Sequence, residues 1–573
     1  MSFLHRLTLG LLLSRFIHRT LPASRPALVV LILIALLLPA GPLPDSRTAA
    51  AVPQNDRFGF VFVNGVGYNI PDARYRQAVE AGAGWTRWPF YWPDIEKSNG
   101  QFDYSAHDAV VNRDRQHGLQ INGILLNNPG WTRGASAAEV GVQPRIGDRP
   151  GVGAPASGLR AQSVTVPGNL YQPVFDGNGN INQSNYWARF VYNTVSRYKG
   201  QVKVWEMWNE PDWTGWFWTG SPAEYYQLLK VGYLAAKHAD PSVTVLHGGL
   251  CHWCANNMGF FDNVAREMAA DPSARHNNFY FDALPMHFYV NPYYAQRFAK
   301  QHRATLARLG TSKPLWINET NVTVCGDPER LPDMTQIDCP SGWRGTLEEQ
   351  SNYMIQIYAL AAALHIDRTL IFQFYDDGIR SDAYGIVRNN GRPRPAYTAI
   401  QTAAKYLNGY TAANLVSGGD YDLVITTGGS EGRVSVAWNK TDRHRTAVVP
   451  ATTGSALLVT KYGQATPISA QGGSYLVSLA PATYSDWQTG ERYIGGDPVF
   501  IVESTCAGPR AGANLPPAPQ TETPISVSWG VTSGDPAGSA RVSVDGISLG
   551  SSTVPVAQAV GYGVLMPLIV RNN

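Results

Sequence analysis

Charged side chains are scarce in this 573-residue sequence, since Asp, Glu, Lys and Arg together make up 16% of it and the formal net charge is +3. The Lys and Arg residues are scattered and form neither a basic stripe nor an RNA-binding motif, which gives little support for a nucleic-acid partner. The sequence also has no phosphate-binding glycine loop and no HExxH helix. We therefore expect no nucleotide, no catalytic metal and no other cofactor.

Cysteine is also rare, with five residues in the chain. Cys251 and Cys254 form a single CxxC pair, and because a second such pair is missing, a local disulfide is favoured over a zinc or redox site. Cys325 and Cys339 bracket a loop rich in Asp and Pro, and we expect a disulfide between them. Cys506 is left unpaired by this count.

Long apolar runs are missing except near the N-terminus, where basic side chains precede the run from Ala27 to Leu43. Its uninterrupted part ends at Pro39, which is shorter than the roughly 20 residues that span a bilayer. The small residues at 49–51 follow as a possible cleavage site. We predict an export signal over residues 1–51, with cleavage favoured over a retained membrane anchor, and a secreted or cell-surface protein, a setting in which disulfides form.

Between Val52 and Gly409 the sequence alternates short apolar runs with amphipathic stretches whose apolar positions lie three and four residues apart. Eight such strand and helix units in about 350 residues predict a closed (β/α)8 barrel, also called a TIM barrel. The expected strands are Phe58–Asn64, Trp85–Trp88, Ile121–Asn127, Val202–Trp208, Val243–Gly249, Phe281–Tyr289, Pro314–Glu319 and Thr369–Tyr375.

The sequence changes character after the barrel. Short alternating runs separated by turn residues predict an antiparallel β-sandwich. A stretch rich in Pro, Gly and Ala follows and is typical of a linker. The expected organisation is a signal or anchor (1–51), the barrel (52–409), the sandwich (410–505), the linker (506–524) and a short β-rich segment (525–573).

Two glutamates stand where a parallel barrel places its working groups, at the carboxyl ends of strands. Glu210 follows the fourth expected strand, where Pro211 stops the chain from continuing, and Glu319 ends the seventh. Paired carboxylates on one cavity suit the cleavage of a glycosidic bond, because one protonates the leaving oxygen and the other attacks the anomeric carbon or activates water. The structural alternative for Glu210 is a charge in the first turn of a helix.

The stretches WEMWNEPD (205–212) and LWINET (315–320) resemble the acid/base and nucleophile motifs of clan A retaining glycosidases. Within that clan the chain is most similar to glycoside hydrolase family 39, which includes xylosidases, iduronidases and bacterial exopolysaccharide hydrolases. The resemblance implies that Glu210 is the general acid/base, that Glu319 is the nucleophile, and that Asn209 hydrogen-bonds the sugar hydroxyl next to the reacting carbon.

Further positions match the clan in part. Arg87 corresponds to an arginine that keeps the nucleophile ionised, since a nearby cation lowers the pKa of a carboxyl group, although a surface salt bridge is the alternative. His287 and Tyr289 match a sixth-strand pattern in which the Tyr orients the nucleophile and the His contacts substrate, although a lone His is often structural. Asn318 departs from the clan, which often has Thr before the nucleophile.

Aromatic residues are abundant, with 16 Trp and 28 Tyr, a composition suited to stacking on sugar rings. Many clan members place a Trp platform on the eighth strand, where this chain has FQFYDDG, so Phe374, Tyr375 or Asp376 are expected to shape the pocket instead. The candidates for stacking on a sugar are Trp92, Trp131, Trp213, Trp216 and Trp218, of which we favour Trp213.

These observations predict an exported retaining glycoside hydrolase that acts on a polysaccharide or oligosaccharide. The two carboxyl groups should then lie about 5 to 5.5 Å apart, whereas a separation beyond about 6.5 Å indicates inversion. Two alternatives remain open at this stage, a noncatalytic carbohydrate-binding surface protein and a transglycosylase.

Overall fold

The computed structural model describes residues 55–66, 70–133, 164–252, 259–329, 343–376, 383–486 and 489–503, together with three strands between residues 527 and 553. The predicted signal (1–51) and most of the long insertion after the third strand lie outside these ranges. Among the described residues, none of the helices combines the length and the apolar composition of a membrane span.

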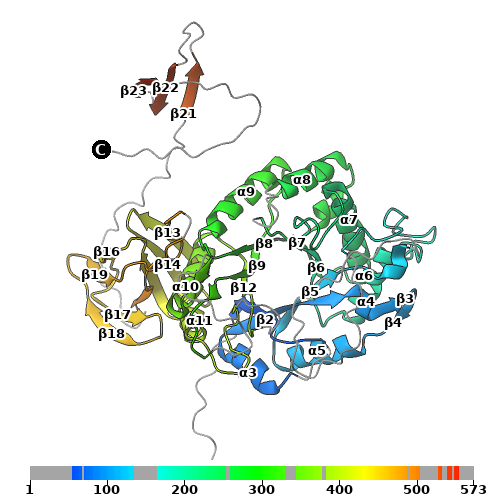
Figure 1. Cartoon of the computed structure of the whole chain (residues 1–573), viewed down its shortest axis with the longest axis horizontal. Helices are drawn as coiled ribbons and strands as arrows, with labels where there is room; N and C mark the ends of the chain where they lie inside the picture. The colour runs from blue at the N-terminus through cyan, green and yellow to red at the C-terminus, as the bar shows by residue number, and fades with distance from the viewer. Residues whose placement is uncertain are drawn as a thin grey trace, which may run out of the picture. The chain divides into compact units, whose positions relative to one another are not determined.

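Eight parallel strands form the centre of the molecule, in the order β7-β6-β5-β2-β1-β12-β9-β8 (Figure 1). Parallel bridges from Leu246 to Ala283 and from Leu250 to Met286 join β7 to β8 and close the barrel. The eight predicted strands and the TIM barrel are thus confirmed. The strands are β1 (Asn55–Val61), β2 (Ala83–Tyr91), β5 (Gln120–Leu126), β6 (Val204–Asn209), β7 (Thr244–Gly249), β8 (Leu284–Tyr289), β9 (Leu315–Asn321) and β12 (Arg368–Ile371).

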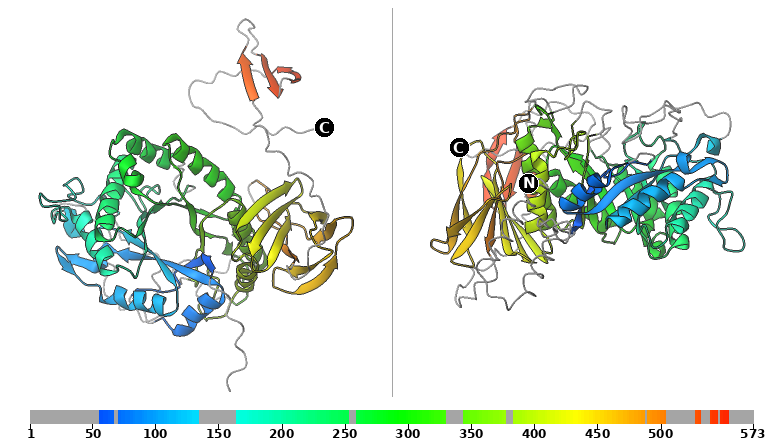
Figure 2. Two further views of the ribbon diagram at one scale, coloured as in Figure 1. Left: turned by 180° about the vertical axis from the view of Figure 1, so that it is seen from behind. Right: turned by 90° about the horizontal axis from the view of Figure 1, so that it is seen from below.

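Helices surround the barrel as an outer ring (Figure 2). Two of them begin with a capping box, in which Ser221 and Glu224, or Thr346 and Glu349, satisfy each other's backbone N–H groups. These caps fix where each helix leaves the preceding loop. The ring consists of α3 (Asp72–Glu80), α5 (Ser105–Gln116), α6 (Tyr186–Arg197), α7 (Pro222–Ala239), α8 (Phe260–Ala270), α9 (Tyr294–Arg308), α10 (Leu347–Ala363) and α11 (Pro395–Tyr406).

The strands read as continuous apolar runs because helices cover their outer face while side chains fill the barrel interior. Every residue of β2 and of β6 is buried. The packing is tight at Gly123 on β5, where a Cβ atom would lie 2.9 Å from the rings of both Phe90 and Trp205. Glycine at this position therefore lets two large rings meet between the strands and the surrounding helices.

An antiparallel sandwich follows the barrel, as predicted. A six-stranded sheet with the order β13-β14-β15-β20-β17-β18 packs on the pair β16-β19, and Leu423, Tyr475 and Ile501 lie in the core between them. The sequence did not predict β13, β18 or β20, although β20 lies at the centre of the larger sheet. The strands are β13 (Ala412–Gly418), β14 (Tyr421–Gly429), β15 (Gly432–Asn439), β16 (Arg445–Pro450), β17 (Ser455–Thr460), β18 (Ala465–Ser469), β19 (Ser474–Leu479) and β20 (Val499–Glu503).

The chain divides into two compact units at residues 507 and 508, and the barrel and the sandwich belong to the first. In the second unit β21 (Val527–Val531), β22 (Ser539–Val544) and β23 (Ile547–Thr553) form a three-stranded antiparallel sheet. The predicted limits of the individual domains stay predictions.

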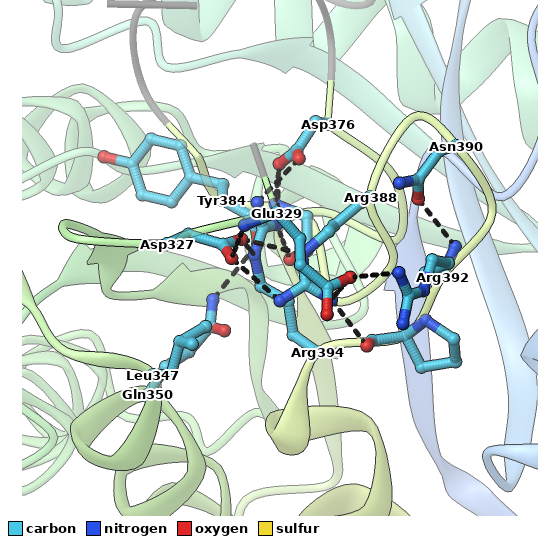
Figure 3. A network of polar contacts seen from close by, with 12 residues as sticks. Asp327, Glu329, Leu347, Gln350, Asp376, Tyr384, Arg388, Asn390, Arg392 and Arg394 are labelled. Carbon is cyan, nitrogen blue, oxygen red and sulfur yellow. Dashed lines mark hydrogen bonds and ion pairs between the residues drawn. The ribbon is translucent and has the colours of Figure 1, made fainter. Parts of the chain in front are cut away.

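A buried network of two arginines and two aspartates ties the segment after β9 to the segment after β12 (Figure 3). Asp327 accepts hydrogen bonds of 2.8 Å from Arg388 and Arg394, and Arg394 also donates to both carboxylate oxygens of Asp376, at 2.9 and 2.8 Å. Burial alone would raise the pKa of Asp327, but the two guanidinium groups outweigh it and lower the pKa below its usual value. The network thus holds two loops of the barrel mouth together.

We expect Arg394→Ala to lower the free energy of unfolding by about 3 to 5 kcal/mol, because it leaves two buried carboxylates without their shared cation. Arg392→Ala is the matched control: Arg392 pairs with Glu329 at 3.1 Å, but its side chain is 68% exposed, so the loss should stay below about 1 kcal/mol. Denaturant unfolding of both variants measures the difference, and equal losses would contradict this account of the network.

Candidate active site

Glu210 and Glu319 meet at the carboxyl end of the barrel. Glu210 follows β6 with a left-handed φ of 43°, and its N–H donates to the carbonyl of Gly249 at 2.9 Å. Glu319 lies near the end of β9, and both side chains are buried. One carboxylate oxygen of each glutamate and a ring nitrogen of His287 all lie within 4.8 Å of one another. Two acids that are 109 positions apart in the sequence thus share one small site.

Arg87 lies at the base of this site and is fully buried, which excludes the surface salt bridge considered above. Its Nη1 donates to Oε1 of Glu319 at 2.5 Å, and its Nη2 donates to Oδ1 of Asn209 at 2.7 Å. Its Nε and Nη2 also donate to the two carboxylate oxygens of Glu206, at 2.8 and 2.9 Å. Arg87 therefore connects a carboxylate at the mouth to one deeper in the barrel.

Glu206 is a part of the site that the sequence reasoning missed. It lies within β6, is completely buried, and accepts hydrogen bonds from Asn318 at 2.9 Å, from the N–H of Gly249 at 2.8 Å and from Asn122 at 3.3 Å. The glutamate inside the apolar run VWEMW could have indicated this role, because a buried carboxylate requires a cation and hydrogen-bond donors. Asn318, the departure from the clan motif, has its own function here as a donor to this carboxylate.

His287 and Tyr289 on β8 contact the two acids directly. Nδ1 of His287 is hydrogen-bonded to Oε1 of Glu210 at 2.8 Å and lies 3.7 Å from Oε2 of Glu319. The hydroxyl of Tyr289 donates to Oε2 of Glu319 at 2.7 Å. The other edge of the imidazole packs on Gly249, where a Cβ atom would come within 2.0 Å of Nε2. His287 is therefore held behind the acids, and the predicted contact with substrate stays a prediction.

The two carboxyl groups have pKa values shifted in opposite directions. Burial raises the pKa of Glu210, and the nearby charge of Glu319 raises it further. Burial would also raise the pKa of Glu319, but the charges of His287 and Arg87 and the hydrogen bonds from Tyr289 and Arg87 outweigh it and lower the pKa. The site therefore holds one carboxyl group whose pKa is raised and one whose pKa is lowered, an arrangement that suits an acid beside a nucleophile.

Asn209 has an unused donor in the site. Its Oδ1 accepts from Arg87, which orients the amide, whereas its buried Nδ2 has no hydrogen-bond partner among the described residues. A buried N–H group without a partner costs free energy, so a ligand that offers an oxygen there gains a hydrogen bond. The predicted contact between Asn209 and a sugar hydroxyl fits this geometry.

The tryptophan candidates divide into core and surface. Trp92 and Trp218 are buried in the core, and Trp131 is half-buried against Tyr186. Trp213 follows the acid directly, because its N–H donates to the carbonyl of Glu210 at 2.9 Å. Its ring lies 5.2 Å from that of Trp216, which is 43% exposed.

The run after β12 is arranged differently from the prediction. Phe374 is buried against Phe60, Tyr375 donates its hydroxyl to Gln77 on α3, and Asp376 belongs to the arginine network. The partners described for these three residues are thus the barrel core, α3 and the arginine network. Two other rings, Phe372 and Tyr384, lie near the site instead, with ring centroids 5.9 and 5.4 Å from that of Tyr289. The sequence reasoning did not name either of them.

The same atoms of Glu210, His287 and Glu319 are close enough to share a cation. Several of the possible ligand atoms are already hydrogen-bonded, because the two oxygens of Glu319 accept from Arg87 and Tyr289, and Oε1 of Glu210 is bonded to Nδ1 of His287. A metal ion would also lie beside the guanidinium charge of Arg87, which it would repel. The arrangement therefore favours proton transfer at the carboxylates, and the expectation of a metal-free site stays a prediction.

The cysteine predictions fall partly outside the described residues. Cys251 and Cys325 are described and buried, whereas Cys254, Cys339 and Cys506 are not described. The two proposed disulfides therefore stay predictions.

The barrel with its trailing sandwich is an architecture found among glycoside hydrolases. A family 39 glycoside hydrolase from the gut symbiont Bacteroides cellulosilyticus WH2 is similar over 78% of this chain and 80% of its own, with a TM-score of 0.53 and 16% sequence identity. A monomeric beta-xylosidase from Caulobacter crescentus CB15 is matched over 78% of this chain and 96% of its own, with a TM-score of 0.46 and 13% identity. The first likeness confirms the predicted resemblance to family 39 at the level of the fold.

Sequence comparison adds a short match. A beta-xylosidase from Caldicellulosiruptor saccharolyticus is 35% identical over 82 residues, which is 13% of this chain and 17% of the relative. The chain thus matches less than a fifth of the length of this curated relative. No family model matches the sequence.

Proposed function

We propose that this protein is an exported retaining glycoside hydrolase that cleaves O-glycosidic bonds of a polysaccharide or oligosaccharide by double displacement. The observation that carries the proposal is the pair Glu210 and Glu319, whose carboxyl oxygens approach within 4.8 Å and whose pKa values are shifted apart. A spacing this short belongs to the retaining class, in which the carboxyl groups lie about 5 to 5.5 Å apart. The names of the family 39 glycoside hydrolase and of the beta-xylosidase matched by sequence support the same activity, and the N-terminal apolar run supports export.

In the first step the ionised carboxylate of Glu319 attacks the anomeric carbon and forms a glycosyl ester, while the bond to the leaving oxygen breaks. Glu210 donates its proton to that oxygen, and Asn209 donates a hydrogen bond to the neighbouring sugar hydroxyl. In the second step Glu210, now a carboxylate, takes a proton from water, the water attacks the anomeric carbon, and Glu319 leaves.

The geometry also explains how Glu210 changes roles between the two steps. The negative charge of Glu319 is one of the causes that raise the pKa of Glu210. Esterification removes this charge, so the pKa of Glu210 falls once the glycosyl ester has formed. The acid of the first step therefore becomes the base of the second through the loss of one neighbouring charge.

A noncatalytic carbohydrate-binding protein and a transglycosylase are the alternatives. In both alternatives the sugar would bind at the same barrel mouth as in the proposed hydrolase. The first predicts binding without turnover, and the second predicts transfer to an added acceptor sugar in place of water.

We expect Glu210→Gln and Glu319→Gln each to lower kcat on a panel of aryl glycosides and microbial polysaccharides by at least about a thousandfold, since each removes a group that the reaction needs. Glu224→Gln, at the N-terminus of α7, is the matched control and should leave kcat unchanged. NMR of the first product should show retained anomeric configuration. Binding of glycans without turnover of any substrate would contradict the proposal, as would an inverted product.

The activity should depend on pH through both acids, because Glu319 must be ionised and Glu210 protonated. Activity is therefore lost at low pH as Glu319 gains a proton, and at high pH as Glu210 loses one. Tyr289→Phe removes a hydrogen bond that stabilises ionised Glu319, so the acid limb of the pH profile should move up by about one pH unit.

Tyr353→Phe is the matched control for this experiment. The hydroxyl of Tyr353 is buried and bonded to Thr320, which is next to Glu319 in the chain, but Tyr353 has no bond to a carboxylate of the site. The acid limb of the pH profile of Tyr353→Phe should therefore stay at the wild-type pH. A shift of the same size in both variants, or none with Tyr289→Phe, would contradict the role given to Tyr289.

A further inference from the structure

Two pairs of partly exposed aromatic rings lie beside the paired acids, and the mechanism above uses neither. The first pair is Trp213 and Trp216, in the segment that follows β6, with ring centroids 5.2 Å apart. The second pair is Trp343 and Tyr384, with centroids 6.3 Å apart and planes inclined by 29°. Trp216 is 43% exposed and Trp343 is 39% exposed, so both present a large apolar ring to solvent.

The second pair is connected to the nucleophile through ring contacts. Tyr384 lies 5.4 Å from Tyr289, whose hydroxyl is bonded to Glu319. The backbone carbonyl of Tyr384 is fixed by Asn321 at the end of β9, at 2.7 Å. Trp343 immediately precedes β11 (Arg344–Gly345), which pairs with β10 (Thr323–Val324) after β9. Trp343 and Tyr384 are therefore anchored on the nucleophile's side of the mouth.

The order of the strands puts the two pairs on opposite sides of the barrel. Around the closed ring, β6 and β12 are separated by four steps in either direction. The loop after β6 carries Trp213 and Trp216, and the loop after β12 carries Tyr384, on which Trp343 stacks. Because parallel strands all end at the same mouth, the paired acids lie between the two aromatic pairs.

We propose that these pairs are two sugar-binding platforms, and that the enzyme binds a polysaccharide across the barrel mouth and cleaves it at internal bonds. Flat aromatic rings bind the apolar faces of sugar rings, and a platform on either side of the scissile bond requires sugar residues on both sides. A site that removes single terminal sugars needs no platform beyond the terminal residue. This inference rests on the proposed function and specifies its substrate as a chain of several sugar residues.

The first test follows the size of the products. A screen of soluble xylans, glucans, galactans and microbial exopolysaccharides identifies the polymer that the full-length protein cuts best. With that polymer, size-exclusion chromatography should show a fall in chain length after few bonds are broken, with oligosaccharides as early products. Release of single sugars from an otherwise intact polymer would overturn the inference and leave the proposed hydrolase standing.

The second test uses variants of the platforms. Trp216→Ala and Trp343→Ala should each raise KM for the polymer about five- to tenfold, the scale of one lost ring contact, and leave kcat/KM on 4-nitrophenyl monosaccharides unchanged. Trp216→Phe and Trp343→Phe should retain most of the affinity for the polymer, which a merely structural role would not require. Tyr171→Ala is the matched control, since Tyr171 is 66% exposed but interacts with charges of α7 and α8 on the flank of the barrel.

A third test does not depend on turnover. In Glu319→Gln, calorimetric affinity for oligosaccharides cut from the same polymer should rise with chain length until both platforms are covered, and each Trp→Ala change should remove part of that gain. Affinity that is independent of chain length, or equal losses on polymer and monosaccharide, would overturn the platforms. Wild-type protein without activity on any glycoside would instead overturn the proposed function itself.

Discussion

The site depends on one buried cation, the guanidinium of Arg87, which is shared between Glu206 inside the barrel and Glu319 at its mouth. Three carboxyl groups are buried close together here, and burial raises the pKa values of two of them, Glu210 and Glu319. Arg87, His287 and Tyr289 outweigh burial at Glu319 and lower its pKa, whereas at Glu210 burial and the charge of Glu319 outweigh His287 and Arg87 and the pKa is raised. Glu206 in turn fixes Arg87 through two hydrogen bonds, so the difference between the two acids is built into the barrel itself.

The fold supplies this arrangement from distant parts of the chain. The site draws Arg87 from β2, Glu206 and Asn209 from β6, His287 and Tyr289 from β8, and Glu319 from β9. Because these strands are parallel and end together, each can contribute one or two side chains to the same few ångströms. The loops that follow these strands are held by contacts of their own. On the side of Glu319 the arginine network around Asp327 provides these contacts.

The sequence predicted the barrel and the sandwich, and it pointed to residues that meet at the candidate site, because these signals are local. Apolar runs, a proline after Glu210 and two acids at strand ends can all be read without a structure. Glu206 was missed because it lies within a strand, and only the register of β2, β5 and β6 shows that it meets Arg87. Tyr384 was missed for a similar reason, since it approaches Tyr289 only when the loop after β12 folds back. The strand β20 was missed because it is remote in sequence from β15 and β17, which it joins.

In the proposed double displacement, Arg87 keeps Glu319 ionised as the nucleophile. Incubation with a 2-deoxy-2-fluoro glycoside that carries a good leaving group should slow the second step more than the first and trap the glycosyl ester. Peptide mass spectrometry of the inactivated protein would then locate the sugar. A single ester should form on Glu319, and it should form much more slowly in Arg87→Met. A label on another residue, or turnover without any trapped ester, would rule out Glu319 as the nucleophile.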